Sequence, residues 1–183
     1  MKQSKAYLKI SNIAYKQAIE TLLNERFENK IDFFWENNLA KIIAYDCDNF
    51  SYSLKQAINI MISDFFTSIS VIIVPKFHDL FVKYFDKINN TVISAFDIFI
   101  MNINDEQIKN DSRLLLENIK KEYIETANVF LNCNMNACQA AKELYLHRNS
   151  FNYRLNQFYY TSEMDVKDFD TAVFLKLIFS LLS

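Results

Sequence analysis

The most constraining feature of this sequence is the absence of glycine from all 183 positions. Average usage of about 7% would supply roughly 13 glycines. A phosphate-binding loop, a dinucleotide-binding fingerprint and the strand-turn-helix elbow of a nucleophilic serine each need glycine where the backbone approaches a ligand or takes a positive φ. The sequence therefore excludes these three kinds of site.

The remaining composition is that of a globular protein with little net charge. Apolar residues make up 51% of the chain, which is enough for a sizeable core, and the net charge of −2 gives no general attraction to polyanions. Any basic surface must be local. The chain contains 16 lysines but only 4 arginines, so each arginine position is informative.

Cysteine usage and hydropathy favour a cytoplasmic protein with no membrane span. The three cysteines, Cys47, Cys133 and Cys138, are odd in number and lack paired short spacings, so we expect neither a zinc site nor a disulfide framework. The longest uncharged, largely apolar run has 11 residues, which is too short to cross a bilayer. We expect no metal and no cofactor.

The first part of the chain is predicted to be a small α/β layer, residues 1–104. Apolar spacing indicates helices over residues 4–25, 52–66 and 77–88, and strands over 30–35, 39–45, 68–74 and 91–101. A turn at Glu36-Asn37-Asn38 joins the first two strands, because asparagine tolerates positive φ best after glycine. Helices covering a small sheet are expected from this alternation.

Residues 105–183 are predicted to be all helical, which makes the whole fold α+β. A long helical pattern runs from Asp105 to Leu131 with a break at residues 110–112, and a terminal helix is expected over residues 170–182. Between them, residues 136–158 have the pattern of a helix-turn-helix. Asn136 can cap a first helix with Ala140 and Ala141 inside, and residues 145–147 form the turn.

The second helix of this motif, of about ten residues, carries the candidate site. Phe151, Leu155 and Phe158 form one buried stripe, so the other side faces outward. Residues 142–157 hold three bases and one acid, a net charge of +2 in an otherwise acidic chain. The candidate DNA-binding residues share this helix or its start: His147, Arg148, Asn149, Ser150, Asn152, Tyr153, Arg154 and Asn156.

Two alternatives remain open for the charged members of this set. The arginine fork matches guanine edges and phosphates, which favours base contact by Arg148 and phosphate contact by Arg154. Either guanidinium could instead form an intramolecular salt bridge, and Arg154 on the flank of the buried stripe is the stronger candidate for that. His147 could contact a phosphate or cap the second helix.

Residues 144–155, LYLHRNSFNYRL, resemble the H-R-N-T-L-x-Y-R-L signature of the PucR/CdaR-type C-terminal helix-turn-helix. The resemblance covers 60 to 70 residues and includes residues 164–168, MDVKD, before the closing helix. It implies a bacterial transcription regulator that binds an operator through this motif. Three departures are Glu163 where the family usually has glycine, Phe169 where proline is common, and Ala140 in place of a common threonine.

Many members of that family carry a degenerate GGDEF-like domain ahead of the DNA-binding region, and the order of elements over residues 30–101 is similar to part of such a domain. If the likeness holds, Trp35 to Asn38 lie where an active cyclase would carry its Gly-Gly turn and acidic residues. The resemblance then implies that nucleotide chemistry is absent.

Other reactive groups carry less weight. Asp46 and Asp48 beside Cys47 oppose thiolate formation, and His78 lies beside Asp79 on an expected helix. Three acids, Asp165, Asp168 and Asp170, are better explained as helix caps than as a cation site.

The sequence thus predicts a non-enzymatic, cytoplasmic, sequence-specific regulator that binds double-stranded DNA as a homodimer. Its effector cannot be named from the residues. The alternative is a non-catalytic interaction or scaffold protein whose helix-turn-helix no longer binds DNA.

Overall fold

The computed structural model describes residues 2–65 and 67–183, and it has an α+β fold. The chain divides into two compact units. The first ends at Ile98 and contains a sheet with helices, and the second runs from Phe99 to Ser183 and is helical. Each unit has its own buried residues, as expected for separate cores.

The first unit is built on a five-stranded sheet in the order β2-β3-β1-β4-β5. The strands are β1 (Gln3–Ile10), β2 (Ile31–Glu36), β3 (Leu39–Tyr45), β4 (Ile69–Val74) and β5 (Val92–Ser94). β1 pairs antiparallel with β3 and β4, β2 pairs antiparallel with β3, and β5 runs parallel to β4. With α1 (Lys16–Arg26) after β1 and α2 (Phe50–Phe65) after β3, the first four strands have the split βαβ topology.

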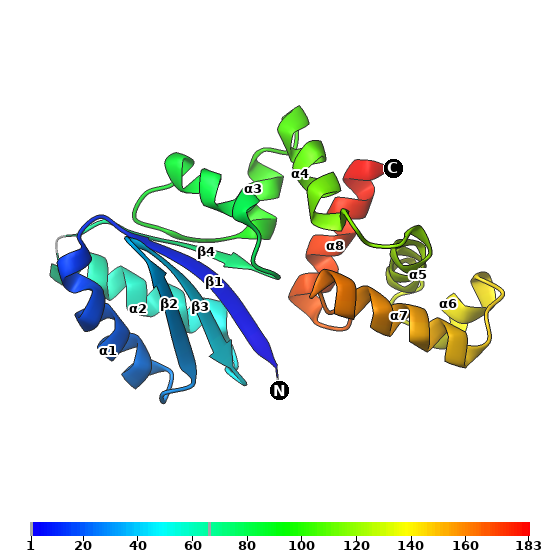
Figure 1. Ribbon diagram of the computed structural model, residues 1–183, viewed down its shortest axis with the longest axis horizontal. Helices are drawn as coiled ribbons and strands as arrows, with labels where there is room; N and C mark the ends of the chain where they lie inside the picture. Colours follow the sequence, from blue (N-terminus) through cyan, green and yellow to red (C-terminus); the bar gives the residue numbers. More distant parts are fainter. Residues whose placement is uncertain (1, 66) are drawn as a thin grey trace. The chain divides into compact units, whose positions relative to one another are not determined.

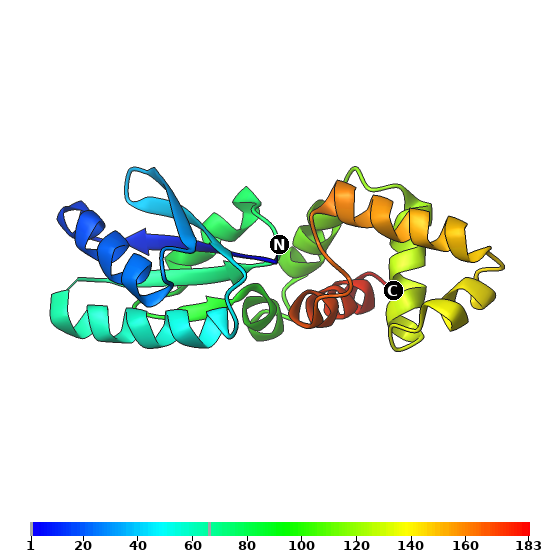
Figure 2. The same cartoon turned by 90° about the horizontal axis from the view of Figure 1, so that it is seen from below.

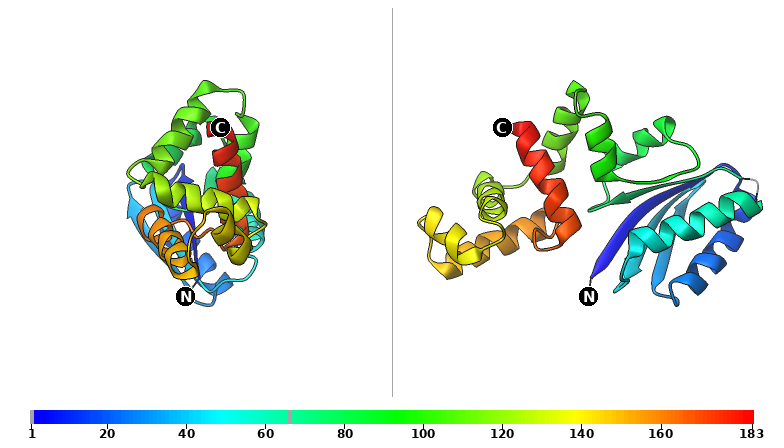
Figure 3. Two further views of the ribbon diagram at one scale, coloured as in Figure 1. Left: turned by 90° about the vertical axis from the view of Figure 1, so that its right-hand side faces the viewer. Right: turned by 180° about the vertical axis from the view of Figure 1, so that it is seen from behind.

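Both helices cover the same face of this sheet (Figure 1 and Figure 3). Alternate strand residues point to that face, including Leu8 of β1 and Ile42 of β3, which are fully buried. They form one hydrophobic cluster with Ile19 of α1 and Leu54 of α2. This burial is the main source of stability for the unit.

The other face of β1 is covered by the segment that follows β4. The rings of Tyr7 and Phe77 meet edge to face at 5.2 Å, and Lys9 lies over the ring of Phe85. Phe85 belongs to the 3-10 helix η2 (Asp79–Lys87), whose apolar residues are largely buried. The hydroxyl of Tyr7 is buried there without a partner in normal hydrogen-bonding geometry.

The prediction of a helix over residues 4–25 was wrong in its first half. Residues 3–10 form the central strand of the sheet, and α1 begins only at Lys16, after the short 3-10 helix η1 (Ile13–Tyr15) capped by Asn12. The apolar spacing of this stretch fits a helix, but Ala6, Leu8 and Ile10 also alternate. Because residues 3–10 pair with a strand on each side, they form a strand rather than a helix.

The predicted strand over residues 91–101 was also wrong beyond its first part. β5 ends at Ser94, and Ala95–Met101 form α3. Ser94 and Asp97 make a reciprocal cap, in which the Asp97 N–H donates to Ser94 Oγ at 3.1 Å and the Ser94 N–H donates to Asp97 Oδ2 at 3.2 Å. The helix expected over residues 77–88 is the 3-10 helix η2, and the hairpin turn has Asn37 at φ 55° as expected.

The second unit continues with five α-helices after α3. They are α4 (Glu106–Leu116), α5 (Lys121–Asn132), α6 (Ala137–Glu143), α7 (Arg148–Ser162) and α8 (Phe169–Leu182). Phe99 meets Phe174 of α8 edge to face at 5.0 Å, and Ile108 and Leu115 of α4 are fully buried. Across the described ranges, no helix combines the length and the apolarity needed to span a bilayer.

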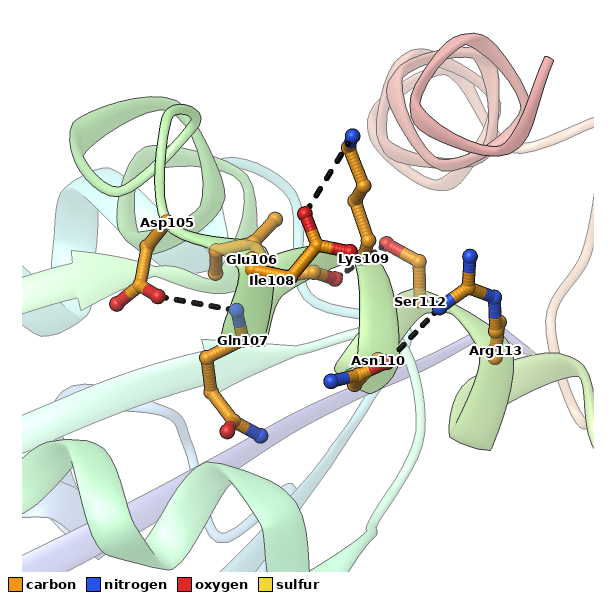
Figure 4. Close-up of polar contacts among 8 residues, drawn as sticks. All are labelled: Asp105, Glu106, Gln107, Ile108, Lys109, Asn110, Ser112 and Arg113. Carbon is orange, nitrogen blue, oxygen red and sulfur yellow. Dashed lines mark hydrogen bonds and ion pairs between the residues drawn. The ribbon is translucent and has the colours of Figure 1, made fainter.

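The break expected at residues 110–112 lies instead after Leu116. Figure 4 shows Asn110 and Ser112 inside α4, where the Ser112 hydroxyl donates to the Ile108 carbonyl at 2.8 Å and Arg113 donates to Asn110. The helix begins at the Asp105 cap, and Asn118 at φ 67° separates it from α5. Polar side chains that suggested a break form bonds along the helix instead.

Candidate nucleic-acid interface

Three helices, α5, α6 and α7, form the predicted helix-turn-helix and the helix that supports it. Phe151, Leu155 and Phe158 are buried as predicted, and the Phe151 ring lies 6.0 Å from that of Phe130 on α5. Ala140 and Ala141 of α6 are also buried. Figure 2 shows α6 and α7 meeting at the turn, at one end of the second unit.

The start of α6 and the turn after it are fixed by the backbone. The Asn136 side chain accepts the N–H groups of Cys138 and Gln139 at 3.1 Å, so the predicted cap is confirmed. Tyr145 takes φ 54° and is 96% exposed, and the Leu146 N–H donates to the Ala141 carbonyl at 2.8 Å. A bulky residue in the left-handed region therefore makes the reversal between the two helices.

His147 caps α7. Its Nδ1 accepts the N–H of Asn149 at 3.3 Å, which realises the capping alternative for this residue. Since Nδ1 is an acceptor, the proton of the neutral ring lies on Nε2. The ring remains exposed, so capping leaves Nε2 open to other partners.

The outward side of α7 is polar and contains no carboxylate. Arg148, Asn149, Ser150, Asn152 and Asn156 are all exposed. The helix is 15 residues long rather than the expected ten, and its continuation adds Tyr160 to the exposed side. This surface, residues 147–150, 152, 153 and 156, is called the α7 face below.

Arg154 lies at the edge of the α7 face and forms an ion pair within the unit. Its Nη2 is 3.1 Å from Glu122 Oε2 on α5, and the two side chains are 27% and 45% exposed. The intramolecular alternative is therefore realised for Arg154. Among the described residues, Arg148 has no ion pair, so its guanidinium is open to other partners.

Tyr153 also reaches back to α5, although its side chain is 57% exposed. The neighbouring Tyr123 side chain is the main cause that raises the pKa of Tyr153 above its usual value of 10. Lys120 lies over the Tyr123 ring with its Nζ 5.6 Å from the centroid. The start of α5 thus holds both Tyr153 and Arg154.

Sequence reasoning missed the part that Lys120 and Glu122 play beside the α7 face. They lie more than 25 residues before α7 in the chain, and only the packing of α5 on α7 brings them near. A pattern confined to residues 136–158 carries no signal for them.

The other reactive groups form no second site. Within residues 2–65 and 67–183, no group of three His, Cys, Asp or Glu side chains is arranged to hold a metal. Asp168 caps α8 by accepting the Thr171 N–H, and Asp165 accepts the Lys167 N–H. Burial is the main cause that raises the pKa of the Cys47 thiol.

Two departures from the resembled signature have clear structural places. Glu163 ends α7 in the left-handed conformation at φ 59°, and its N–H donates to the Tyr159 carbonyl at 2.7 Å. A glycine would take this conformation without strain. Phe169 is the first residue of α8 and is exposed, which is a position where proline is tolerated.

Comparison with known proteins agrees with this geometry. Residues 123–181 match the family model of the PucR C-terminal helix-turn-helix domain. They begin in α5 and end in α8, so the match covers α6, the turn and all of α7.

One curated relative and one solved structure extend the comparison. The chain is 34% identical over 68 residues to the uncharacterized protein YxkF of Bacillus subtilis (strain 168), and this stretch covers 37% of the chain and 23% of that protein. The regulator of polyketide synthase expression from Bifidobacterium adolescentis shares 13% identity at a TM-score of 0.44, over all of this chain and 81% of that one. Over residues 123–181, this chain is therefore similar to the PucR C-terminal helix-turn-helix domain family.

Proposed function

We propose that this chain is a transcription regulator that binds double-stranded DNA in a sequence-specific way, with α7 in the major groove. The observation that carries the proposal is the exposed α7 face, which has no acid and bears Arg148 at its amino-terminal end. A recognition helix contacts bases mainly through its first residues, and an acid there would repel phosphate.

Individual roles follow from exposure and chemistry. Arg148 is suited to the O6 and N7 atoms of a guanine, and Asn149 to an adenine edge. Ser150 and the Nε2 side of His147 are suited to phosphate oxygens. Asn152, Tyr153 and Asn156 extend the contact along the groove, and Arg154 reaches a phosphate only if it leaves Glu122.

The proposed binding unit is a cytoplasmic homodimer without catalytic activity. With a net charge of −2 on the whole chain, one α7 face attracts DNA weakly. Two copies related by a two-fold axis would read half-sites about 34 Å apart, or a multiple of that.

Arg148→Ala tests the role of the key residue. We expect a loss of about 1 to 3 kcal/mol in binding to the selected operator, with relaxed preference at one base pair, since a bidentate base contact is removed. Fragments selected from random duplex DNA supply the operator, and fluorescence anisotropy measures affinity for it and for scrambled DNA. Arg113→Ala, which removes an exposed arginine from α4, is the matched control.

Equal losses on operator and scrambled DNA would reduce Arg148 to a phosphate contact. The salt dependence of binding distinguishes this function from the alternative role, an interaction protein that does not bind DNA. DNA binding must weaken steeply as salt rises because counterions are released, whereas an apolar protein interface changes little.

A further inference from the structure

Strand β2 is an open edge of the sheet, and its only charged residues are two acids, Asp32 and Glu36. It is the first strand in the sheet order and pairs only with β3, whereas the opposite edge, β5, has three residues. β2 has six residues, Ile31–Glu36, of which three in succession are aromatic, and it contains no proline or lysine. Edges of this length and composition favour pairing with another strand.

The register of the β2–β3 hairpin determines which N–H and C=O groups of β2 are not bonded to β3 and can pair with another strand. Asn37 and Asn38 form a two-residue turn, so Glu36 and Leu39 are a hydrogen-bonded pair. Every second residue pair along the hairpin is then hydrogen-bonded, and the Tyr45 N–H, which donates to the Lys30 carbonyl at 2.9 Å, fits this alternation. Asp32, Phe34 and Glu36 therefore turn their main-chain groups toward β3, as does the Lys30 carbonyl, while the Lys30 N–H donates to the Phe27 carbonyl. The main-chain groups of Ile31, Phe33 and Trp35 point outward.

We propose that two copies of this chain dimerise by antiparallel pairing of β2 with β2, with Phe33 opposite Phe33 of the second copy. In this register, Ile31 and Trp35 also face each other across the new ladder. All three outward-facing residues then form hydrogen-bonded pairs, and the two five-stranded sheets become one.

Charge selects this register over its neighbours. With Phe33 on the two-fold axis, Lys30 lies opposite Glu36 of the second copy, which makes two opposite-charge pairs. A shift that centres Phe34 places Asp32 opposite Glu36, and a shift that centres Asp32 places that carboxylate opposite itself. Both alternative registers place like charges opposite each other, and both form fewer hydrogen-bonded pairs.

Lys30 and Glu36 are positioned to make these contacts. Both are exposed, and Lys30 has only its local ion pair with Glu28 at 3.0 Å, in which the two side chains are 51% and 78% exposed. The β2 pairing supplies the dimer that the proposed function requires, but it uses no residue of the α7 face. It can therefore be tested without DNA.

The first test is charge reversal in the full chain, with the dimer dissociation constant measured by sedimentation equilibrium without DNA. We expect Glu36→Lys to raise this constant about tenfold, because two Lys–Lys pairs replace two Lys–Glu pairs. Lys30→Glu combined with Glu36→Lys should restore it. Asp64→Lys on α2 is the matched control for net charge and should leave it unchanged.

The second test fixes the register. Lys30→Cys with Glu36→Cys, in a Cys47→Ser and Cys138→Ser background that removes the two free thiols that are not buried, should give a disulfide-linked dimer on mild oxidation. The two positions are six residues apart on one strand, about 20 Å, so they cannot bridge within one chain. Each single cysteine variant should stay unlinked for the same reason.

A wild-type chain that is monomeric at 100 μM concentration, an unchanged dimer after Glu36→Lys, or linkage by a single cysteine as fast as by the pair would each overturn the proposal. These outcomes are separate from those for DNA. If the β2 dimer forms but Arg148→Ala leaves operator binding intact, only the proposed function fails.

Discussion

At the scale of single residues, asparagine replaces glycine in this chain. Eleven of the described residues, none of them glycine, take a positive φ, and six of these are asparagines: Asn29, Asn37, Asn49, Asn90, Asn118 and Asn134. Asparagine tolerates this region because its short side chain bonds locally. Tyr145 and Glu163 have no such help, and they lie at the two ends of the segment that contains α7.

Tyr145→Gly should stabilise the protein by about 1 kcal/mol, because the left-handed strain of a bulky residue exceeds the entropy that glycine adds to the unfolded chain. Urea denaturation followed by circular dichroism measures this. Tyr160→Gly, an exposed tyrosine inside α7, is the control and should destabilise by about 0.5 to 1 kcal/mol. The same sign for both variants would contradict the argument.

The buried hydroxyl of Tyr7 makes the stability of the protein depend on pH. Burial raises the pKa of Tyr7 to about 12, and the charge of Asp79 adds to this. Because the folded pKa is above the unfolded value of 10, this contribution to stability is complete below pH 10 and is lost as pH rises toward 12.

Tyr7→Phe should be more stable than wild type by about 1 kcal/mol at pH 7, since it removes a buried hydroxyl without a partner. Between pH 10 and 12 the difference should widen by roughly 2 to 3 kcal/mol, because only the wild type has this group to ionise. Urea titrations of both proteins at pH 7, 10 and 11.5 provide the comparison. A constant difference would show that Tyr7 does not titrate with unfolding.

At the scale of helices and strands, α5 controls what α7 presents. The Glu122–Arg154 ion pair and the contact between Tyr123 and Tyr153 hold two of the predicted site residues against α5. The α7 face is left with Arg148 as its open arginine among the described residues. Supported in this way, α7 has one side fixed and one side available.

Glu122→Gln should release the Arg154 guanidinium. Since the pair is partly exposed, we expect a stability loss below about 1 kcal/mol. Affinity for duplex DNA should rise about threefold, because a cation is freed and an anion near the α7 face is removed. Glu125→Gln, an exposed acid one turn later, makes the same charge change, and an equal gain from it would mean that net charge alone is responsible.

At the scale of the whole molecule, the low net charge of one chain favours a dimer for the proposed binding to DNA. The positive charge of the helix-turn-helix lies in a chain whose net charge is −2, so two copies of α7 contribute more to DNA attraction than one can. The open β2 edge belongs to the first unit and the α7 face to the second. We propose that the first unit joins the two copies of the chain and that the second unit contacts DNA.

Much of the second unit could be predicted from the sequence alone, because its determinants are local. The Asn136 cap, the stripe of Phe151, Leu155 and Phe158, and the match to a known signature all lie within about 25 residues. The two-residue turn at Asn37-Asn38 is local in the same way. Helical periodicity and turn chemistry are properties of a short segment, so they can be read without the fold.

What tertiary structure decided depends on neighbours that are distant in the chain. Residues 3–10 fit a helix or a strand by periodicity, and only pairing with β3 and β4 makes them β1. Arg154 fits a phosphate or an acid by chemistry, and only the packing of α5 on α7 brings Glu122 to it. A segment's pattern limits its options, but the free energy of long-range pairing and burial selects among them.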